Sequence, residues 1–256
     1  MISSALLRYS MESLRARTLR SLLTIVSVMI GIAAITSLVG FGSGISSYVD
    51  GIGQKMANDK LIIQARGFAF GPPPIDSNVK LGKSDLETIE GVHGVEEATG
   101  VYVLSGEIEF RKQKKYAYVM GSDFKDHPEL VKEVYTLALL EGNELRGKEK
   151  SKAIFGYNYR LPKKIFEKPL QLRDTVLVNG HEIEVTGFYE EMGNPQDDSN
   201  VYVTTDAAEE VFGMKNYNFI LARASPGSVP TDVADETAKE LRKHRNQGKG
   251  NEDFFV

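Results

Sequence analysis

The sequence contains no cysteine among its 256 residues. Disulfide bonds, thiolate metal sites and cysteine nucleophiles are therefore excluded, although this absence does not decide the compartment. The chain also lacks a strong net charge, because 31 basic and 35 acidic residues leave a formal charge of -4. Proteins that bind nucleic acid normally carry an excess of lysine and arginine, so no nucleic-acid partner is expected.

Charge is missing altogether from residues 22–41, which form a continuous apolar run. A run of about twenty residues is long enough to cross a hydrocarbon core of ~30 Å as a helix. A buried core helix would normally show a polar face, and a signal peptide would have a shorter apolar stretch before an A-x-A-like cleavage site. Neither alternative fits, so the run predicts an uncleaved membrane anchor.

Four arginines precede this run, namely Arg8, Arg15, Arg17 and Arg20. Basic residues next to a span stay in the cytoplasm, so they predict a cytoplasmic N-terminus and an extracytoplasmic location for the bulk of the chain. Within residues 1–21, apolar and charged residues fall on neighbouring helical faces. This pattern predicts a cytoplasmic amphipathic helix that lies on the lipid bilayer.

Apolar residues keep a helical spacing beyond the run, so one transmembrane and stalk helix is predicted over residues 22–56. Within it, Thr36, Gly40 and Gly44 recur every four residues. A stripe of small residues lets two membrane helices approach closely, which predicts a helix–helix contact at this stripe. The alternative is the ordinary frequency of glycine in membrane helices.

The rest of the chain alternates short strand-like and helix-like segments without an internal repeat. Strands are predicted at 60–65, 96–104, 115–121, 153–157, 175–178, 181–186, 200–204 and 218–223. Helices are predicted at 84–90 with Ser84 as the N-cap, and at 129–138, 160–167 and 231–244. The clearest local signal is Asn179-Gly180 between two strand-like arms, which is typical of a tight two-residue hairpin.

Several polar clusters resemble sites without meeting their requirements. Residues 142–149 have the G-x-x-x-x-G-K spacing of a phosphate loop, but Glu149 stands where Ser or Thr must hold magnesium. His181 points away from Glu182 and Glu184 on a strand, whereas zinc ligands must converge. The remaining candidates are acids in loops and single histidines: Asp123, Asp126, His127, Asp197, Asp198, His93 and His244. The loop residues among them could surround a cation, but side chains in surface loops are by default solvated. No catalytic residue, metal site or cofactor is assigned, and no enzymatic activity is predicted.

Three segments resemble the MacB-like ABC transporter permeases, the group with a large periplasmic core domain. Residues 17–34 are similar to the family's arginine-led opening, residues 139–156 to its L-x-E-G-R-x-L stretch and following strand, and residues 172–188 to its N-G-containing segment. Asn143 stands where the family usually has arginine, and Arg173 where it often has glycine. The likeness keeps the family's order along nearly the whole chain.

The resemblance implies an α+β fold in which the N-terminal transmembrane and stalk helix leads into a two-lobed extracytoplasmic domain. A porter-like βαβ lobe would comprise residues 57–121 and 199–256, with a mostly-β lobe inserted at 122–198. Family members continue into three further transmembrane helices, and this chain stops about where the next would begin. It is therefore expected to be a truncated, split or shortened part of a permease.

Family members work as dimers with a separate cytoplasmic ABC ATPase, whose ATP binding moves the outer domains. The resemblance thus implies a membrane-anchored subunit for export or efflux. Its partners would be that ATPase, further permease helices or a second copy, and the lipid bilayer. A stand-alone anchored module that binds a ligand or an envelope partner is the alternative, while an anchored hydrolase lacks a visible catalytic constellation.

Overall fold

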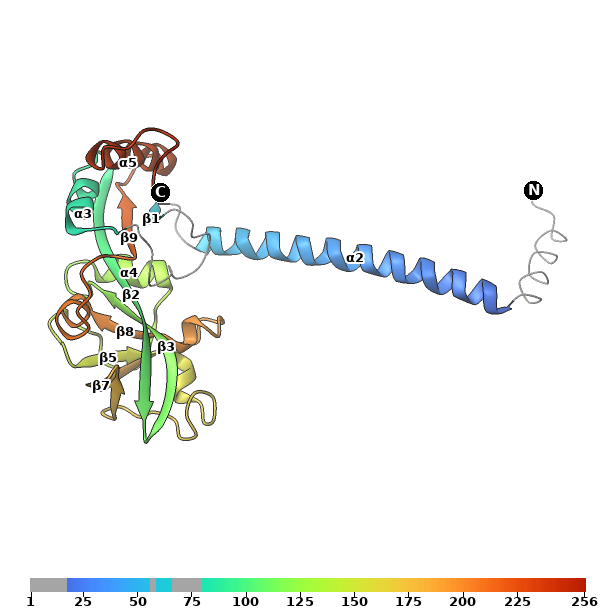
Figure 1. Ribbon diagram of the computed structural model, residues 1–256, viewed down its shortest axis with the longest axis horizontal. Coiled ribbons are helices and arrows are strands. Elements are labelled where there is room, and N and C mark those ends of the chain that lie inside the picture. The colour runs from blue at the N-terminus through green and yellow to red at the C-terminus, as the bar shows by residue number, and fades with distance from the viewer. Residues whose placement is uncertain (1–17, 56–58, 66–79) are drawn as a thin grey trace. The chain divides into compact units, whose positions relative to one another are not determined.

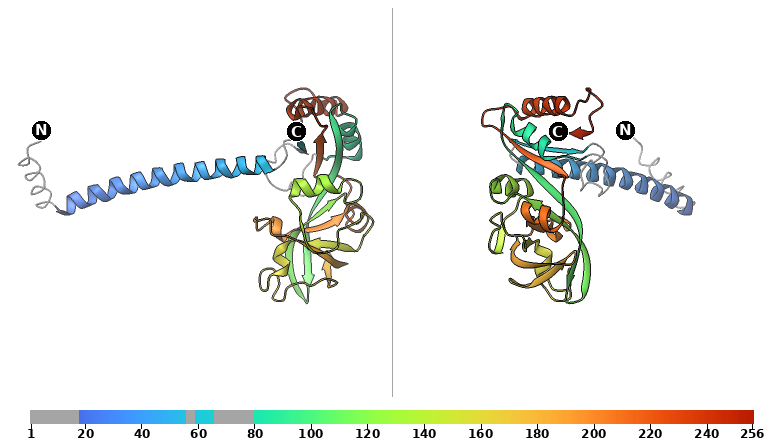
Figure 2. Two further views of the ribbon diagram at one scale, coloured as in Figure 1. Left: turned by 180° about the vertical axis from the view of Figure 1, so that it is seen from behind. Right: turned by 60° about the vertical axis from the view of Figure 1, so that its left-hand side comes forward.

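The computed structural model describes residues 18–55, 59–65 and 80–256 of the chain. The chain divides into one unit, Met1–Lys55, and a second unit, Met56–Val256. Both are drawn as ribbons in Figures 1 and 2. The first unit is helical where it is described, and the second is a mixed α/β domain.

The first unit contains one continuous helix of 38 residues, α2 (Thr18–Lys55). Glycine and β-branched residues are frequent in it, and both weaken a helix in water. In a bilayer every backbone N–H and C=O needs an internal partner, which favours the helix whatever these propensities. The single helix predicted over 22–56 is confirmed as far as Lys55.

The described part of the second unit holds ten strands in one connected sheet. Their bounds are β1 Lys60–Ala65, β2 Val95–Phe110, β3 Gln113–Ser122, β4 Leu139–Gly142, β5 Lys152–Phe155, β6 Thr175–Val178, β7 His181–Tyr189, β8 Val201–Thr204, β9 Phe219–Ala224 and β10 Phe254–Phe255. The helices are α3 Lys83–Glu90, α4 Pro128–Tyr135 and α5 Pro230–His244, with short helical turns η1 Tyr157–Arg160, η2 Asp197–Ser199 and η3 Ala207–Val211. Strand β2 pairs with β9 in its first half and with β3 and β6 in its second half, so it runs through both parts of the sheet.

Six strands close into a small barrel. Around it β2 pairs with β3, β3 with β8, β8 with β5, β5 with β7, β7 with β6, and β6 returns to β2. The return consists of two residue pairs, Ile108 with Val178 and Glu109 with Leu177. Closure removes the exposed edges that an open sheet would present. Buried apolar side chains form the barrel core, among them Ile108, Val119, Phe155, Val176, Val178, Ile183, Val185, Phe188, Val201 and Val203.

Strands β1, β9 and β10 form an antiparallel layer with the first half of β2, in the order β10-β1-β9-β2, with helices on both faces, whereas β4 pairs with β7. Along β9 the side chains alternate between these faces, as the pleat of a strand requires. Ile220 and Ala222 share a hydrophobic cluster with residues of α3 and α5, whereas Leu221 shares one with residues of α4. Figure 1 shows α3 and α5 at the end of the domain away from the barrel.

The predicted Asn179-Gly180 hairpin is confirmed between β6 and β7. Both residues take positive φ values, 49° and 82°, as a two-residue turn of this kind requires. The predicted strands likewise correspond to β1, β2, β3, β5, β8 and β9. The helix predicted at 231–244 is α5, which begins one residue earlier.

Three helix predictions are wrong in part or in full. Residues 161–167 form turns after η1, because Pro162 lacks a backbone N–H and Lys163 takes a left-handed φ of 60°. The N-cap of α3 is Gly82 and not Ser84, and the Gly82 N–H donates to the Asp85 carboxylate at 2.8 Å. The helix predicted at 129–138 ends at Tyr135, because the next residue, Thr136, adopts a left-handed conformation.

The lobe boundaries predicted at 121/122 and 198/199 stay a prediction. The barrel core combines side chains from both sides of these boundaries. Ile108 and Val119 come before the first, and Val201 and Val203 come after the second. Packing therefore joins the proposed insertion closely to the strands that flank it.

Candidate functional site

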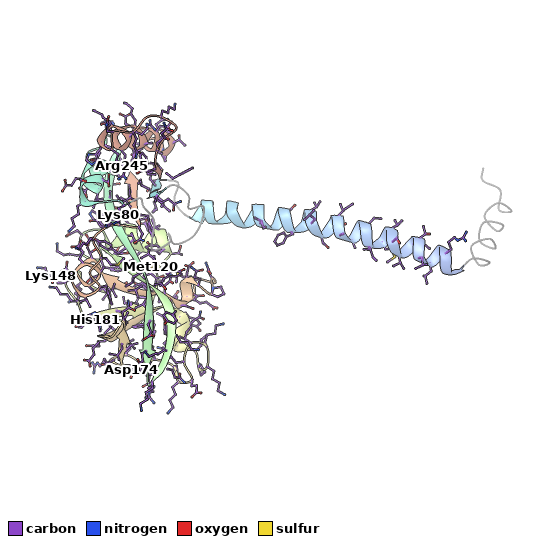
Figure 3. All side chains as sticks on the ribbon, in the orientation of Figure 1. Lys80, Met120, Lys148, Asp174, His181 and Arg245 are labelled. Carbon is purple, nitrogen blue, oxygen red and sulfur yellow. The ribbon has the colours of Figure 1, made fainter. Side chains whose placement is uncertain are left out.

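Residues Leu22–Ile45 of α2 form a 24-residue segment without a charged side chain. Its large apolar side chains are exposed, and Figure 3 shows them projecting all along the helix. At 1.5 Å per residue the segment is about 36 Å long, enough to cross a hydrocarbon core of ~30 Å. The hydroxyls of Thr24, Ser27 and Thr36 donate to backbone carbonyl oxygens one turn earlier, at 2.9, 2.8 and 2.8 Å. These polar groups are thus satisfied within the helix, as an apolar solvent requires.

The small-residue stripe lies on this segment. Thr36, Gly40 and Gly44 follow one another at intervals of four residues on α2, which places them on one face of the helix. A Cβ atom added at Gly40 or Gly44 would meet no other atom within 4 Å, so in the described chain nothing packs on the stripe. The stripe is therefore open for another helix, and the contact itself stays a prediction.

Of the four orienting arginines, Arg20 lies in the first turn of α2 and is exposed. Arg8, Arg15 and Arg17 lie outside the described residues, as does most of the predicted amphipathic helix over 1–21. The predicted orientation across the membrane therefore rests on the sequence.

An ion-pair network around the buried side chain of Lys60 holds β1, the first described element after α2. The Lys60 side chain is only 3% exposed, and its Nζ lies 2.7 Å from Glu133 Oε2 and 3.0 Å from Asp59 Oδ1. Lys60 is the register partner of Arg223 on β9. The Arg223 guanidinium lies 2.9 Å from Glu97 on β2 and 3.2 Å from Glu133 on α4. Three neighbouring strands and one helix are thus joined by alternating charges.

The charges in this network stabilise one another. Burial alone would lower the pKa of Lys60, but the carboxylates of Glu133 and Asp59 outweigh it and raise that pKa. The ammonium of Lys60 lowers the pKa of Glu133. A single buried charge would be costly, whereas pairing with two carboxylates keeps Lys60 charged. The network therefore fixes β1 against α4 in a charged state.

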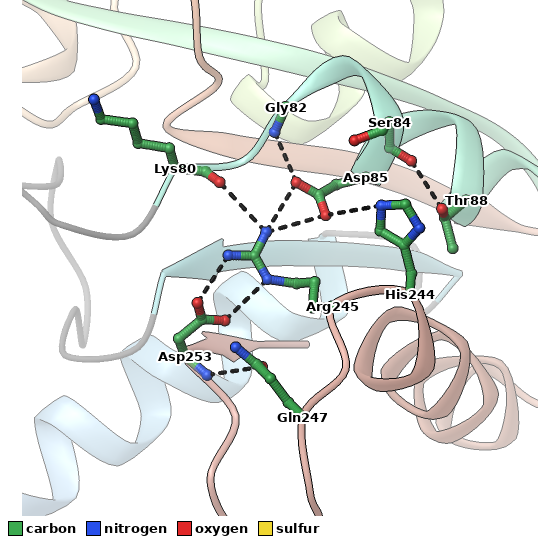
Figure 4. Close-up of polar contacts among 9 residues, drawn as sticks. All are labelled: Lys80, Gly82, Ser84, Asp85, Thr88, His244, Arg245, Gln247 and Asp253. Atoms are coloured by element: carbon green, nitrogen blue, oxygen red, sulfur yellow. Dashed lines mark hydrogen bonds and ion pairs between the residues drawn. The ribbon is translucent and has the colours of Figure 1, made fainter.

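A second network surrounds Arg245, directly after α5 (Figure 4). Its guanidinium donates to both carboxylate oxygens of Asp85 at 3.0 and 2.9 Å, and to Asp253 at 3.1 and 2.8 Å. It also donates to the Lys80 carbonyl oxygen at 3.3 Å, and His244 Nε2 lies 3.8 Å from Asp85. The Asp253 carboxylate raises the pKa of Arg245 further above its ordinary range. The pair with Asp253 is bidentate, through Nε and Nη2, and Nη1 contacts both oxygens of Asp85, so α3, α5 and the segment before β10 are held together.

The sequence candidates for chemistry are dispersed. In residues 142–149 no helix begins, and the Glu149 carboxylate accepts the Arg146 N–H at 2.9 Å, so this segment is a surface turn. The His181 ring packs against Phe212 with centroids 5.8 Å apart, and Glu182 and Glu184 lie on the same strand, β7. Within the described ranges, no three His, Asp or Glu side chains come together as metal ligands.

The loop acids and histidines have local partners. Asp123 accepts the backbone N–H groups of residues 125 and 126, and Asp126 pairs with Lys125. His127 Nδ1 lies 2.9 Å from Glu97 and so extends the network around Lys60. Asp198 is buried and accepts the Met192 N–H, while Asp197 accepts from Asn194. His93 lies in the turn after α3.

Sequence reasoning missed both charge networks. Their members are spread from Asp59 to Asp253, and no motif links them. One signal existed, since Lys60 opens a strand whose next residues are apolar. The distant partner of this lysine, Glu133, comes from α4, and only the folded domain reveals that α4 lies against the start of β1.

Comparison with known proteins gives a consistent result. Residues 21–240 match the family described as MacB-like periplasmic core domain. An uncharacterised ABC transporter permease of Methanocaldococcus jannaschii is 28% identical over 255 residues, which are 98% of this chain and 60% of that protein. The macrolide export ATP-binding/permease protein MacB of Neisseria gonorrhoeae is 27% identical over 97% of this chain and 38% of that protein. The chain thus spans well under two thirds of the length of these relatives.

Solved structures share the fold of the domain. The periplasmic region of MacB from Actinobacillus actinomycetemcomitans has a TM-score of 0.62 at 18% identity, over 79% of this chain and 90% of that one. The extracellular domain of the noncanonic ABC-type transporter YknZ from Gram-positive bacteria has a TM-score of 0.58 at 18% identity, over 77% of this chain and 99% of that one. The α+β fold expected from the sequence is confirmed by these similarities.

Proposed function

The chain belongs to the family of MacB-like periplasmic core domains, and from this premise we propose that it is the N-terminal, membrane-anchored part of an ABC transporter permease. In this proposal α2 crosses the membrane with the N-terminus in the cytoplasm, and residues 56–256 lie outside. A separate cytoplasmic ABC ATPase supplies the energy for export or efflux. The chain itself then catalyses no reaction and transmits movement instead.

The observation that carries the proposal is the succession of a membrane-length apolar helix and a MacB-like domain in one chain. The apolar segment Leu22–Ile45 is followed by the domain without another described element between α2 and β1. The family match begins at residue 21 and so includes both parts. An anchored module that binds a ligand alone would need the same two parts, but the relatives named as permeases favour transport.

A movement of α2 would be transmitted to the domain through β1, the first strand that follows α2 in the chain. That strand is flanked by β10 and β9, and its first residue is tied to α4 by the ion pair between Lys60 and Glu133. Because β1 is paired on both edges and tied at its first residue, it would pass a displacement on to the neighbouring strands and would not separate from them. In our proposal the layer of four strands therefore moves as one body when α2 moves.

The stripe of Thr36, Gly40 and Gly44 would receive a helix of a second copy or of other permease subunits. Two lobes would divide the outer domain, with residues 57–121 and 199–256 in the first and the inserted residues 122–198 in the second. The inserted lobe would supply three of the six barrel strands, β5, β6 and β7. A dimer of such chains would supply two outer domains to the transporter.

Topology can be tested with single cysteines, because the chain has none of its own. Tyr116 is 76% exposed on the domain, and Ser4 precedes the predicted span. In intact cells, a membrane-impermeant maleimide should label the Tyr116→Cys variant and leave the Ser4→Cys variant unlabelled until the cells are opened. The reverse labelling pattern would overturn the proposed orientation.

The transport role is tested by purification of the tagged full chain from its native host in mild detergent. An ABC ATPase and a protein with several membrane spans should copurify, and mass spectrometry would identify both. Copurification of neither partner would favour the stand-alone binding module. The topology experiment would still hold in that case, so the two parts of the proposal can fail separately.

A further inference from the structure

One end of the barrel gathers exposed basic side chains from three turns and from the start of β3. We refer to these residues as the basic end: Arg111, Lys112, Lys115, Lys163, Lys164, Lys168 and Arg173. Figure 3 labels Asp174, which follows the last of them, at the end of the domain opposite Arg245. Arg111 lies over the Phe110 ring at 5.2 Å, but among the described residues no member of the basic end forms an ion pair.

Specific contacts hold the first two turns next to each other and fix the third turn on β7. The Phe110 and Phe166 rings pack with centroids 5.6 Å apart, and the Glu167 N–H donates to Gln113 at 3.0 Å. The Arg173 N–H donates to the Val185 carbonyl oxygen of β7 at 2.8 Å. The basic end is therefore a fixed array of charges on a closed barrel, and not a set of independent loops.

The acids nearby offset this array only in part, because Glu167 between Lys164 and Lys168 and Asp174 beside Arg173 stand against seven basic side chains. Glu107 and Glu109, the nearest acids on β2, lie 2.8 and 3.6 Å from Lys114, which is not a member of the basic end. The Asp174 carboxylate accepts the Gln171 N–H at 2.8 Å. An excess of basic over acidic side chains at one end of a chain with a net charge of -4 marks a local preference for anions.

The backbone gives an independent reason to assign a role to these side chains. Arg111, Lys112, Lys163 and Arg173 have positive φ values of 51°, 67°, 60° and 70°. This left-handed conformation favours glycine or asparagine, and other residues adopt it at a cost of roughly 1 kcal/mol. The β6–β7 hairpin, with Asn179-Gly180, uses the favoured residues for the same two-residue turn that β2 and β3 build with Arg-Lys. Folding alone therefore does not account for the basic residues.

We propose that the basic end binds a flexible, phosphate-bearing polymer, whose successive phosphates contact its basic residues along the three turns. Five of its seven members are lysines, which bind phosphate as compact point charges. A small anion would need a concave pocket, whereas these side chains project from turns. Stable protein interfaces are depleted of lysine and need an apolar core, which this surface does not offer. This binding goes beyond the proposed transport function.

The test uses the full chain in neutral detergent and fluorescently labelled long-chain polyphosphate, with binding measured by anisotropy at increasing salt. The Arg111→Asn/Lys112→Gly double variant should bind about tenfold more weakly at low salt and lose affinity less steeply as salt rises. The same variant should melt at a higher temperature, because its turn then has the favoured residues. Weaker binding together with a more stable fold cannot arise from misfolding.

A matched control removes two exposed charges elsewhere, in the Lys148→Gln/Lys215→Gln variant, which should keep its affinity. Inorganic phosphate at equal phosphate concentration should not compete with the polymer. The proposal is overturned if polyphosphate does not bind, or if the Arg111→Asn/Lys112→Gly variant binds as tightly as the natural chain. Equal affinity for polyglutamate would overturn the assignment to phosphate, and binding to anionic lipid vesicles without binding to polyphosphate would point to a membrane instead.

Discussion

The two units of the chain differ in where their large apolar side chains lie. In Leu22–Ile45 of α2 they are exposed all along the helix, with Leu38 at 74% and Ile35 at 67%. In the described part of the second unit most are buried, and the exposed ones are Ile62, Tyr116, Leu140, Val229 and Phe255. Water-soluble surfaces rarely carry a continuous apolar patch of the first kind. The comparison indicates that the surface of the helix suits a lipid environment and the surface of the domain suits water.

The largest effect should come from charge placed in the lipid-facing segment. The Ile32→Lys/Ile35→Lys variant should lose about 6 kcal/mol of insertion free energy, since each lysine near the centre of a span costs roughly 3 kcal/mol. Alkaline extraction of membranes should then release the variant, while the natural chain stays in the pellet. Tyr116→Lys, which places the same charge on the domain surface, should leave membrane association unchanged. Retention of the double-lysine variant would show that α2 is not surrounded by lipid.

The next effect concerns the water-soluble unit. Phe188 is fully buried in the barrel core, and Phe188→Ala should lower the free energy of unfolding of the domain by about 3–5 kcal/mol. Phe41→Ala removes the same ring from α2, where it is 67% exposed, and should leave that value nearly unchanged. Denaturant unfolding of both variants in detergent, followed by circular dichroism, measures the difference. A similar loss for Phe41→Ala would contradict the separation into two units.

This contrast also explains which features the sequence predicts. The span is readable because residues 22–41 carry no charge, and the β6–β7 hairpin because Asn179-Gly180 is a local signal. Closure of the barrel depends on the pairing of β2 with β6, whose residues Ile108 and Val178 are seventy positions apart along the chain. The basic end was not foreseen either, because its turns are separated in sequence and two of them are joined only by contacts of the folded barrel, Phe110–Phe166 and Gln113–Glu167. Local periodicity therefore predicts elements, whereas long-range register decides the sites.

A smaller effect should follow from the charge that the domain buries. In Glu133→Gln, the Lys60 ammonium loses its nearer carboxylate and keeps only Asp59, so the domain should lose about 1–3 kcal/mol of stability. Glu129→Gln on the same helix is the control, because Glu129 is 72% exposed and should contribute less than about 0.5 kcal/mol. Replacement of the pair in Lys60→Met/Glu133→Leu should recover much of the lost stability. Equal losses for the two glutamine variants, measured by denaturant unfolding, would mean that the network does not hold β1.

The smallest effect is a difference between the two units in how they respond to pH. Lys60 lowers the pKa of Glu133 below its ordinary value of 4.5, so the carboxylate stabilises the fold more when it is charged. That stability is fully present above the unfolded value and is lost as the pH falls through the lower folded value. The melting temperature of the domain should therefore fall between about pH 5 and about pH 3, and it should fall less in Glu133→Gln. Membrane association should not change over this range, because Leu22–Ile45 contains no titratable group. A domain that melts independently of pH would show that Glu133 is not stabilised by Lys60, whereas acid release from the membrane would show that titratable groups outside α2 contribute to anchoring.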